Sequence, residues 1–361
     1  MLKLAILGAG GFVGSRAVEL FHLTQAFDVR PVVNRPGAMA RAARFRLDWR
    51  LADVLDRAAL AASFRGCDLV LHLATGDPRV ITGGVRPVYE AASSAGIKRI
   101  VYMSSASVHG QAPDPGTDED APLHRRHPHA YNNAKVDAEL QWKRLRRNGG
   151  PEIVVLRPSI VFGPRSRWVA SFAEDLLGGR AYLVDGGRGI CNTIYVDNLL
   201  HAIRLALTAP GIHGETFLVG DGERTTWHQF YEPIARALGV DPATIPIVDR
   251  LPDFRPRLRD RVRALKSTGP VQFGLRCTPP GLKRSVKAAI AGWRGANTAP
   301  AAAAAASAPQ PTLEMALLHR CQWQLSSAKA AGAFGYEPVV SVAEGLRRSI
   351  AWLEFAGYPV Q

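Results

Sequence analysis

Short apolar runs alternate with amphipathic stretches through the first half of the chain. Uninterrupted apolar runs are typical of strands that are buried on both faces, and helical stretches between them favour parallel pairing. The sequence therefore predicts an α/β fold with a Rossmann-type, doubly wound parallel sheet. The predicted strands are Leu4–Leu7, Val29–Val33, Leu69–Leu73, Ile100–Met103 and Ile153–Leu156.

The strict alternation weakens after Gly163, which indicates a smaller C-terminal lobe that binds substrate. We assign residues 1–165 to an NAD(P)-binding Rossmann domain, and residues 166–254 and 312–361 to the lobe, mixed with Rossmann elements. Asp197 is interpreted as the N-cap of a helix in this lobe. The predicted strands here are Tyr182–Val184, Thr193–Val196 and Thr216–Val219, and the predicted helices are Asn198–Thr208, Trp227–Leu238 and Ala343–Phe355.

Residues 255–311 form a basic insertion that ends in an Ala/Pro-rich tract, which is typical of a partly mobile linker. The whole chain has a formal net charge of +14, and the insertion carries most of this excess. Apolar residues at helical spacing predict two basic amphipathic helices within 257–294. One hypothesis is that they contact an anionic membrane and deliver a lipidic substrate; the other is that they pack on the lobe with their charges in water. The patch lacks interleaved aromatic residues, which disfavours nucleic acid as a partner.

The remaining composition argues against metal and disulfide chemistry and predicts a cytoplasmic enzyme, with peripheral membrane contact left open by the insertion. The four cysteines are far apart and form no CxxC pair. His124, His127 and His129 lack an accompanying carboxylate or thiol at ligand spacing, so we interpret them as loop residues near the substrate entrance and predict no metal site. No apolar stretch is long enough for a transmembrane helix.

A glycine-rich turn, Gly8 to Gly14, follows the first predicted strand and precedes a helical stretch. Gly8 permits a tight turn, Gly11 lets backbone N–H groups approach a pyrophosphate, and Gly14 allows close packing of helix and strand, with Phe12 and Val13 in the first turn. In this context the motif predicts a dinucleotide site.

The second predicted strand ends in Asn34 and Arg35, where an NAD site normally offers a carboxylate to the ribose. No acidic group there repels a 2′-phosphate, and the Arg35 guanidinium can pair with one. NADP(H) is therefore favoured over NAD(H). The alternative is that Arg35 is a solvated loop charge.

Several ordered motifs together resemble the extended short-chain dehydrogenase/reductase family, the NAD-dependent epimerase/dehydratase group. They are GAGGFVG at Gly8–Gly14, LADVLD at Leu51–Asp56, HLA at His72–Ala74, YMSSASVHG at Tyr102–Gly110, YNNAK at Tyr131–Lys135 and LRPSIVFGP at Leu156–Pro164. The resemblance implies that Asp53 and Val54 contact the adenine, that Leu73 and Ala74 line the cofactor path, and that Pro158 lies beside the nicotinamide. Family members are often dimers, so a homodimer is expected by resemblance.

Tyr131 and Lys135 are one helical turn apart and lie on one face of a predicted helix. A nearby ammonium favours the phenolate, so the pKa of Tyr131 is expected to fall from about 10 toward working pH, as an acid/base catalyst requires. Lys135 is also expected to hold the nicotinamide ribose. The resemblance selects Ser105, rather than Ser104 or Ser107, as the hydroxyl that stabilises charge on the substrate oxygen.

Departures from the family pattern narrow the reaction. Sugar-nucleotide dehydratases of the family carry an acidic pair after the hydroxyl residue, where this chain has Ala106 and Ser107, and dehydration is therefore disfavoured. Ile160 stands where many sugar-nucleotide enzymes have Asn, which weakens the epimerase interpretation without excluding it. The sequence predicts a ketone/aldehyde reductase or secondary-alcohol dehydrogenase acting on a small molecule with a hydroxyl or carbonyl carbon. The alternatives are a nucleotide-sugar epimerase and a non-catalytic NAD(P)-binding regulatory or assembly protein.

Overall fold

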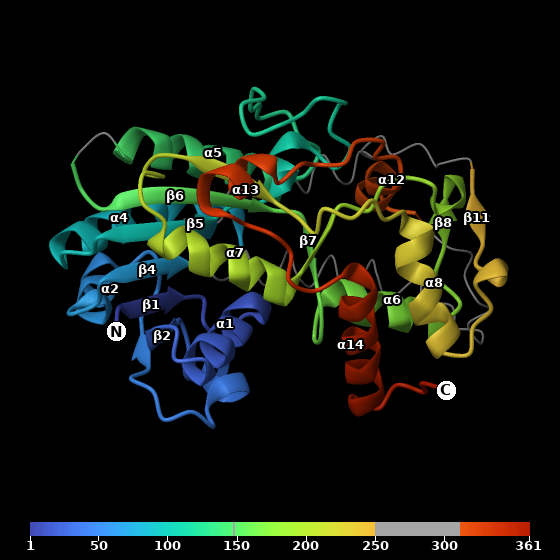
Figure 1. Ribbon diagram of the computed structural model, residues 1–361, viewed down its shortest axis with the longest axis horizontal. Helices are drawn as coiled ribbons and strands as arrows, with labels where there is room; N and C mark the ends of the chain where they lie inside the picture. Colours follow the sequence, from blue (N-terminus) through green and yellow to red (C-terminus); the bar gives the residue numbers. More distant parts are fainter. Residues whose placement is uncertain (147–148, 250–310) are drawn as a thin grey trace, which may run out of the picture.

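Seven parallel strands form the central sheet, in the order β10-β6-β5-β4-β1-β2-β3 (Figure 1). The computed structural model describes residues 1–146, 149–249 and 311–361, so the predicted basic helices within 257–294 and the Ala/Pro tract lie outside the described residues. The strands of this sheet are β1 (Lys3–Leu7), β2 (Asp28–Val33), β3 (Arg50–Leu51), β4 (Leu69–His72), β5 (Arg99–Met103), β6 (Glu152–Pro158) and β10 (Thr216–Val219).

Helices cover both faces of the sheet, which confirms the prediction of a Rossmann-type α/β fold. Alternate residues of β1 enter two separate cores, with Leu4 and Ile6 in one and Ala5 and Leu7 in the other. The first core is covered by α1 (Phe12–Leu23), α7 (Val196–Thr208) and α13 (Ala328–Phe334). The second is covered by α2 (Arg57–Phe64), α3 (Pro78–Gly83), α4 (Val85–Ser94) and α5 (Ala130–Leu145).

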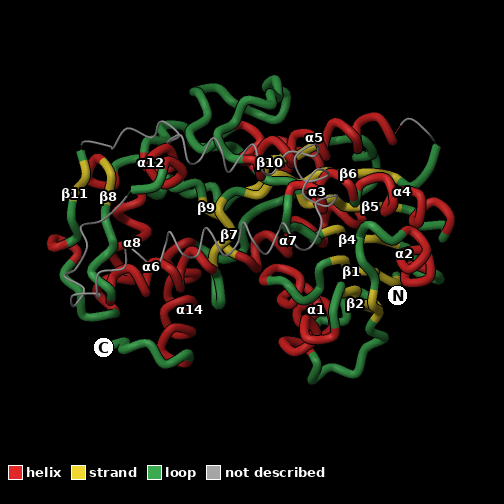
Figure 2. The backbone as a smooth tube through the Cα atoms, turned by 180° about the vertical axis from the view of Figure 1, so that it is seen from behind, coloured by secondary structure: helices red, strands yellow, loops and turns green. Residues whose placement is uncertain are grey.

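The remaining elements form a lobe at one end of the molecule (Figure 2). Its core contains a ring stack between Phe172 and Tyr231, whose centroids are 3.5 Å apart. Two short parallel pairs, β7 with β9 and β8 with β11, belong to this region. The lobe elements are α6 (Arg167–Leu177), α8 (Trp227–Ala237), α12 (Leu313–His319), α14 (Val342–Phe355), β7 (Ile160–Phe162), β8 (Leu183–Val184), β9 (Thr193–Tyr195) and β11 (Ile247–Val248). The 3₁₀ turns η4 (Asp185–Gly187) and η5 (Pro242–Thr244) contact α8 of the lobe, whereas η1 (Pro36–Ala42) and η2 (Ala106–His109) contact elements of the central sheet domain.

Several element ends differ from the predicted ones by one or two residues, and one of these differences changes an interpretation. The strand predicted to end at Val196 stops at Tyr195, which is the N-cap of α7, so the interpretation of Asp197 as the N-cap is wrong. Asp197 instead lies in the first turn, where its carboxylate accepts two hydrogen bonds from Arg16 of α1, at 2.8 and 2.9 Å. This ion pair ties two helices on the same face of the sheet together. None of the helices in the described residues is long and apolar enough to cross a membrane.

Candidate active site

A cavity of about 540 Å³ runs from the carboxyl edge of the central sheet toward the lobe. Gly8 follows β1, Leu73 follows β4, Ser105 follows β5 and Ser159 follows β6, so the loops at one end of four neighbouring strands line it. Ligands of doubly wound sheets bind at this edge. Ten of the predicted site residues line the cavity: Gly8, Gly11, Phe12, Val13, Gly14, Leu73, Ser105, Tyr131, Lys135 and Pro158.

The glycines of the first turn are required by close backbone approaches. Gly8 has a φ of +80°, and a Cβ there would lie 2.8 Å from the backbone nitrogen of Ala74. A Cβ on Gly14 would lie 2.1 Å from the carbonyl oxygen of Gly8. Both positions therefore need glycine for the protein's own packing.

The N-terminus of α1 opens directly into the cavity. Gly11 is its N-cap and provides no side-chain cap, and the first turn holds no acidic residue. The N–H groups of a helix's first turn have no partner within the helix, and the helix dipole makes this end positive. The donors and the space fit a dinucleotide pyrophosphate.

Five predicted cofactor residues lie outside the lining of this cavity: Asn34, Arg35, Asp53, Val54 and Ala74. Asn34 and Arg35 are exposed at the end of β2, beside β1, and the Arg35 side chain has no ion pair with any described residue. The Asp53 carboxylate accepts the N–H of Leu55 at 2.9 Å, and Val54 is buried. Of the five, Ala74 borders the glycine turn, because its backbone lies against Gly8.

Ser105 and Tyr131 meet in the middle of the cavity. The hydroxyls of Ser105 and Thr75 lie near the Tyr131 hydroxyl and act to lower its pKa. The Ser105 hydroxyl is 2.9 Å from that of Ser107, and it accepts the N–H of Ser107 as the cap of η2. Ser104 also lines the cavity, but it is buried and its hydroxyl donates to the Glu139 carboxylate. Of the three neighbouring serines, Ser105 is therefore held by contacts against the tyrosine.

Lys135 lies under these groups and is only 2% exposed. Its ammonium donates to the carbonyl oxygen of Met103 at 2.7 Å and to the Tyr102 hydroxyl at 3.4 Å, and it lies 5.7 Å from the centroid of the Tyr131 ring. Burial lowers the pKa of Lys135 to about 8, against an opposing effect of the Glu139 carboxylate. The amine therefore loses its charge near pH 8 and is still mainly protonated at neutral pH.

The expected fall in the pKa of Tyr131 is wrong for this geometry. Burial raises the pKa of Tyr131, and the hydroxyls of Thr75 and Ser105 only partly oppose this. The residue as a whole is 38% exposed and lines the cavity. Desolvation disfavours the phenolate, and this effect outweighs that of the two neighbouring hydroxyls. The neutral phenol is a proton donor.

A buried ion pair next to Lys135 and Ser104 was not predicted from the sequence. Glu139, one turn after Lys135 on α5, pairs with Arg157 of β6 at 2.7 Å, and both are less than 7% exposed. Arg157 also donates to the carbonyl oxygen of Glu119 and lies 3.0 Å from a ring nitrogen of His109. Helical spacing from Tyr131 and Lys135 could have identified Glu139, but its partner could not be found from local pattern.

The lobe end of the cavity is mainly apolar. Its side chains include Ile160, Trp168, Ile190, Leu318 and Leu325. Several polar groups there already have protein partners. The Asn192 amide bonds to the carbonyl of Trp323 and the N–H of Leu325, and Asn132 donates to Gln111.

Arg167 and Glu314 also line the cavity. The histidine cluster does not line it. His127 contacts the Val108 carbonyl and stacks on His124, and the backbone of His127 bonds to Asn133 of α5. These contacts fasten the loop to the serine turn.

Comparison with known proteins agrees with this arrangement. The sequence model described as the NAD dependent epimerase/dehydratase family matches residues 4–220. The chain is 24% identical to 3beta-hydroxysteroid-dehydrogenase/decarboxylase isoform 1 of Arabidopsis thaliana, over 96% of this chain and 78% of that protein. It is 31% identical to cinnamoyl-CoA reductase 1 of Oryza sativa subsp. japonica, over 60% of this chain and 70% of that protein. The solved structure of UDP-glucose 4-epimerase from Thermotoga maritima is similar in fold, with a TM-score of 0.70, 20% identity and coverage of 98% and 99% of the two chains.

Proposed function

The chain belongs to the NAD dependent epimerase/dehydratase family, and we propose that it is an NADP(H)-dependent reductase of apolar ketones or aldehydes, or the corresponding secondary-alcohol dehydrogenase. The observation that carries the proposal is the phenol of Tyr131, which lines one cavity together with Ser105 and Lys135. It lies between the glycine turn and an apolar chamber within one cavity. Hydride chemistry on a carbonyl needs a proton donor at this junction.

The cofactor is proposed to lie along the carboxyl edge of the sheet, with its pyrophosphate at Gly11 and the start of α1. When bound, the nicotinamide supplies or accepts the hydride. The exposed Arg35, without an ion pair among the described residues, is the proposed partner of a 2′-phosphate. Lys135 lines the same cavity, where its ammonium is placed to hold a ribose hydroxyl.

In the reduction direction, Tyr131 donates its phenolic proton to the carbonyl oxygen as that oxygen gains negative charge. The Ser105 hydroxyl, held beside the phenol, hydrogen-bonds to the same oxygen and stabilises the developing charge. The raised pKa of Tyr131 keeps the proton on the residue until it is needed. The positive charge of Lys135 then stabilises the phenolate that is left.

The apolar chamber supports a reductase over a nucleotide-sugar epimerase. A sugar nucleotide presents many hydroxyl and phosphate groups, and each needs a polar partner when it leaves water. Ile160, Leu318 and Leu325 offer none, and the Asn192 amide is already bonded within the protein. The presence of Ser105, Tyr131 and Lys135 in one cavity also disfavours a non-catalytic binding protein.

The proposal is tested by following NADPH oxidation with a panel of alicyclic and aromatic ketones and aldehydes. Tyr131→Phe should lower kcat by about 10²- to 10⁴-fold, because it removes only the proton donor. Tyr89→Phe is the matched control, since Tyr89 is a buried residue of α4 that does not line the cavity. Activity of Tyr131→Phe within twofold of the parent would overturn the assigned role. Tightly retained NAD with epimerisation of a nucleotide sugar would favour the alternative.

A further inference from the structure

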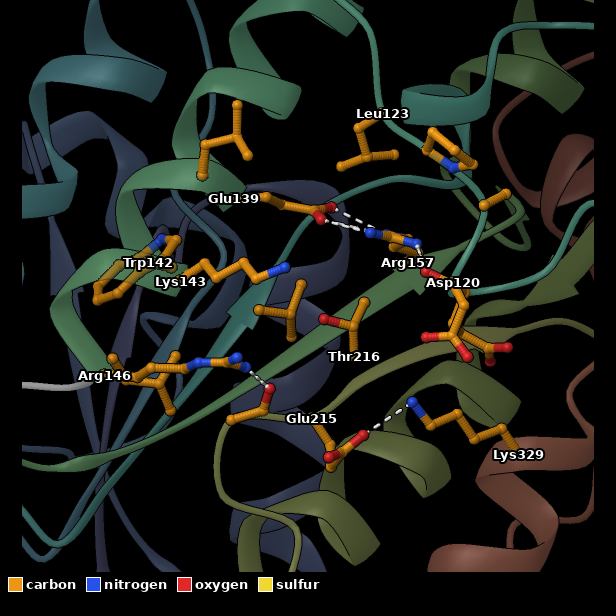
Figure 3. A pocket seen from close by; sticks show the side chains of 17 residues that line it. Asp120, Leu123, Glu139, Trp142, Lys143, Arg146, Arg157, Glu215, Thr216 and Lys329 are labelled. Carbon is orange, nitrogen blue, oxygen red and sulfur yellow. Dashed lines mark hydrogen bonds and ion pairs between the residues drawn. The ribbon is translucent and has the colours of Figure 1, made fainter.

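A second cavity of about 370 Å³ lies over β6 and β10, on the face of the sheet that α5 covers (Figure 3). Its floor is formed by Ile153, Val155 and Arg157, which are alternate residues of β6, and by Thr216 of β10. Within the described residues, no residue lines both this second cavity and the active-site cavity of about 540 Å³. Its volume falls within the range of small-molecule sites.

Two ion pairs inside this cavity are complete. Glu139 and Arg157 pair at 2.7 Å at one end, and Lys329 of α13 pairs with Glu215 at 2.8 Å at the other (Figure 3). Each pair neutralises itself, so neither leaves a net charge for a ligand.

The charges that remain are separated by sign. On the α5 wall, Lys143 has no hydrogen bond or ion pair with any described residue, and Arg146 is engaged only by the carbonyl oxygen of Gly214. On the loop wall, the Asp120 carboxylate has no partner in the part of the chain that the structure describes, and the Glu119 carboxylate accepts only the N–H of Leu218. In Figure 3, Lys143 extends toward the middle of the cavity and Asp120 lies across from it.

From this separation we propose that the second cavity binds a small dipolar molecule with a carboxylate at one end and an ammonium at the other, such as an amino acid or a short aminoalkanoic acid. The carboxylate meets Lys143 and Arg146, and the ammonium meets Asp120 and Glu119. A simple anion would face the acidic wall unpaired, and a simple amine would face the basic wall unpaired.

The floor suits the part of such a molecule between its charges. Ile153 and Val155 offer apolar contact to methylene groups, and the Thr216 hydroxyl, which has no hydrogen bond with any described residue, offers a donor and an acceptor. The floor is also rigid, because β6 pairs with a strand on each side. The site therefore exists before the ligand arrives, which lowers the entropic cost of binding.

The test is calorimetric titration of the full chain, saturated with NADP(H), at low ionic strength. The probes are aminoalkanoates of increasing length up to 6-aminohexanoate, with hexanoate and hexylamine as partners that each lack one charge. Among equal chain lengths, the aminoalkanoate should bind most tightly. Lys143→Gln and Asp120→Asn should each weaken its binding by about fivefold, the contribution of one exposed ion pair.

Arg144→Gln is the matched control, because Arg144 is an exposed cation on α5 next to Lys143 that does not line the cavity. It should leave the affinity unchanged. Three results overturn the proposal: hexanoate or hexylamine binding as tightly as 6-aminohexanoate, aminoalkanoate binding that ignores both substitutions, or no binding of any aminoalkanoate. None of these results bears on the reductase activity.

Discussion

Replacing Arg157 by Met tests whether the buried ion pair behind the active site holds the sheet to α5. Arg157 is 4% exposed, and its Nε and Nη2 donate to both carboxylate oxygens of Glu139 at 2.7 to 3.2 Å. The substitution leaves the buried Glu139 carboxylate with the Ser104 hydroxyl as its only hydrogen-bond partner among the described residues, and the Lys135 ammonium, which acts on it electrostatically, makes no ion pair with it. Removing one member of a buried pair costs about 3–5 kcal/mol, because the other charge stays uncompensated. This is a large share of a typical free energy of unfolding.

Urea denaturation measures this loss directly, and the double variant Glu139→Gln with Arg157→Met supplies the control. The amide that replaces the carboxylate in the double variant carries no charge, so at least about 2 kcal/mol of the loss should return. A single-variant cost below about 1 kcal/mol, or a double variant as unstable as the sum of the two single ones, would refute the reasoning.

Four further outcomes are expected. Gly14→Ala should destabilise the fold and weaken NADPH binding, because its Cβ would lie 2.1 Å from a backbone oxygen, whereas Gly11→Ala, with its nearest contact at 3.3 Å, should fold and serve as the control in thermal unfolding. Arg35→Ser should raise the Kd for NADPH by about tenfold to a hundredfold and leave that for NADH unchanged, measured by nicotinamide fluorescence. The pKa of Lys135 is about 8 in the folded chain and 10.5 when exposed, so between pH 8 and 10.5 the unfolded chain binds one more proton than the folded chain. The free energy of unfolding, measured by urea titration relative to Lys135→Met, should therefore rise by about 3 kcal/mol as the pH increases from 8 to 10.5. Burial lowers the pKa of His319 from 6.5 to about 4, so its contribution to the free energy of unfolding falls by about 1.4 kcal/mol per pH unit as the pH drops from 6.5 to 4. The free energy of unfolding of His319→Gln should lack this part of the pH dependence.

The local sequence pattern was sufficient to predict the glycine turn, which acts through its backbone, and the pair of catalytic candidates that lie one helical turn apart. The apolar run before Gly8 identifies β1, and the spacing of Tyr131 and Lys135 places both on α5. The two residues of β3, Arg50 and Leu51, are both exposed and form no apolar run, so nothing in the sequence distinguishes them from a loop.

Features that depend on contacts between residues far apart in the sequence could not be predicted from the sequence. The strand β10 was predicted from its own apolar residues, but its pairing with β6, at the edge of the central sheet, is set by tertiary packing. Leu318 and Leu325 enter the active-site cavity although they are far from Tyr131 in sequence. The pKa of Tyr131 was misjudged for the same reason, because spacing reveals a neighbouring amine but not the burial that opposes it.

The central claim, a reductase that exchanges its cofactor, is tested most directly with NADPH deuterated at the hydride position and an apolar ketone accepted in the panel. We expect an alcohol that carries deuterium on its carbinol carbon, with free NADP⁺ released in equal amount and the transfer slowed by about 10²- to 10⁴-fold in Tyr131→Phe. Retention of the dinucleotide on the protein, together with a nucleotide sugar that is inverted without acquiring deuterium from added NADPH, would contradict it.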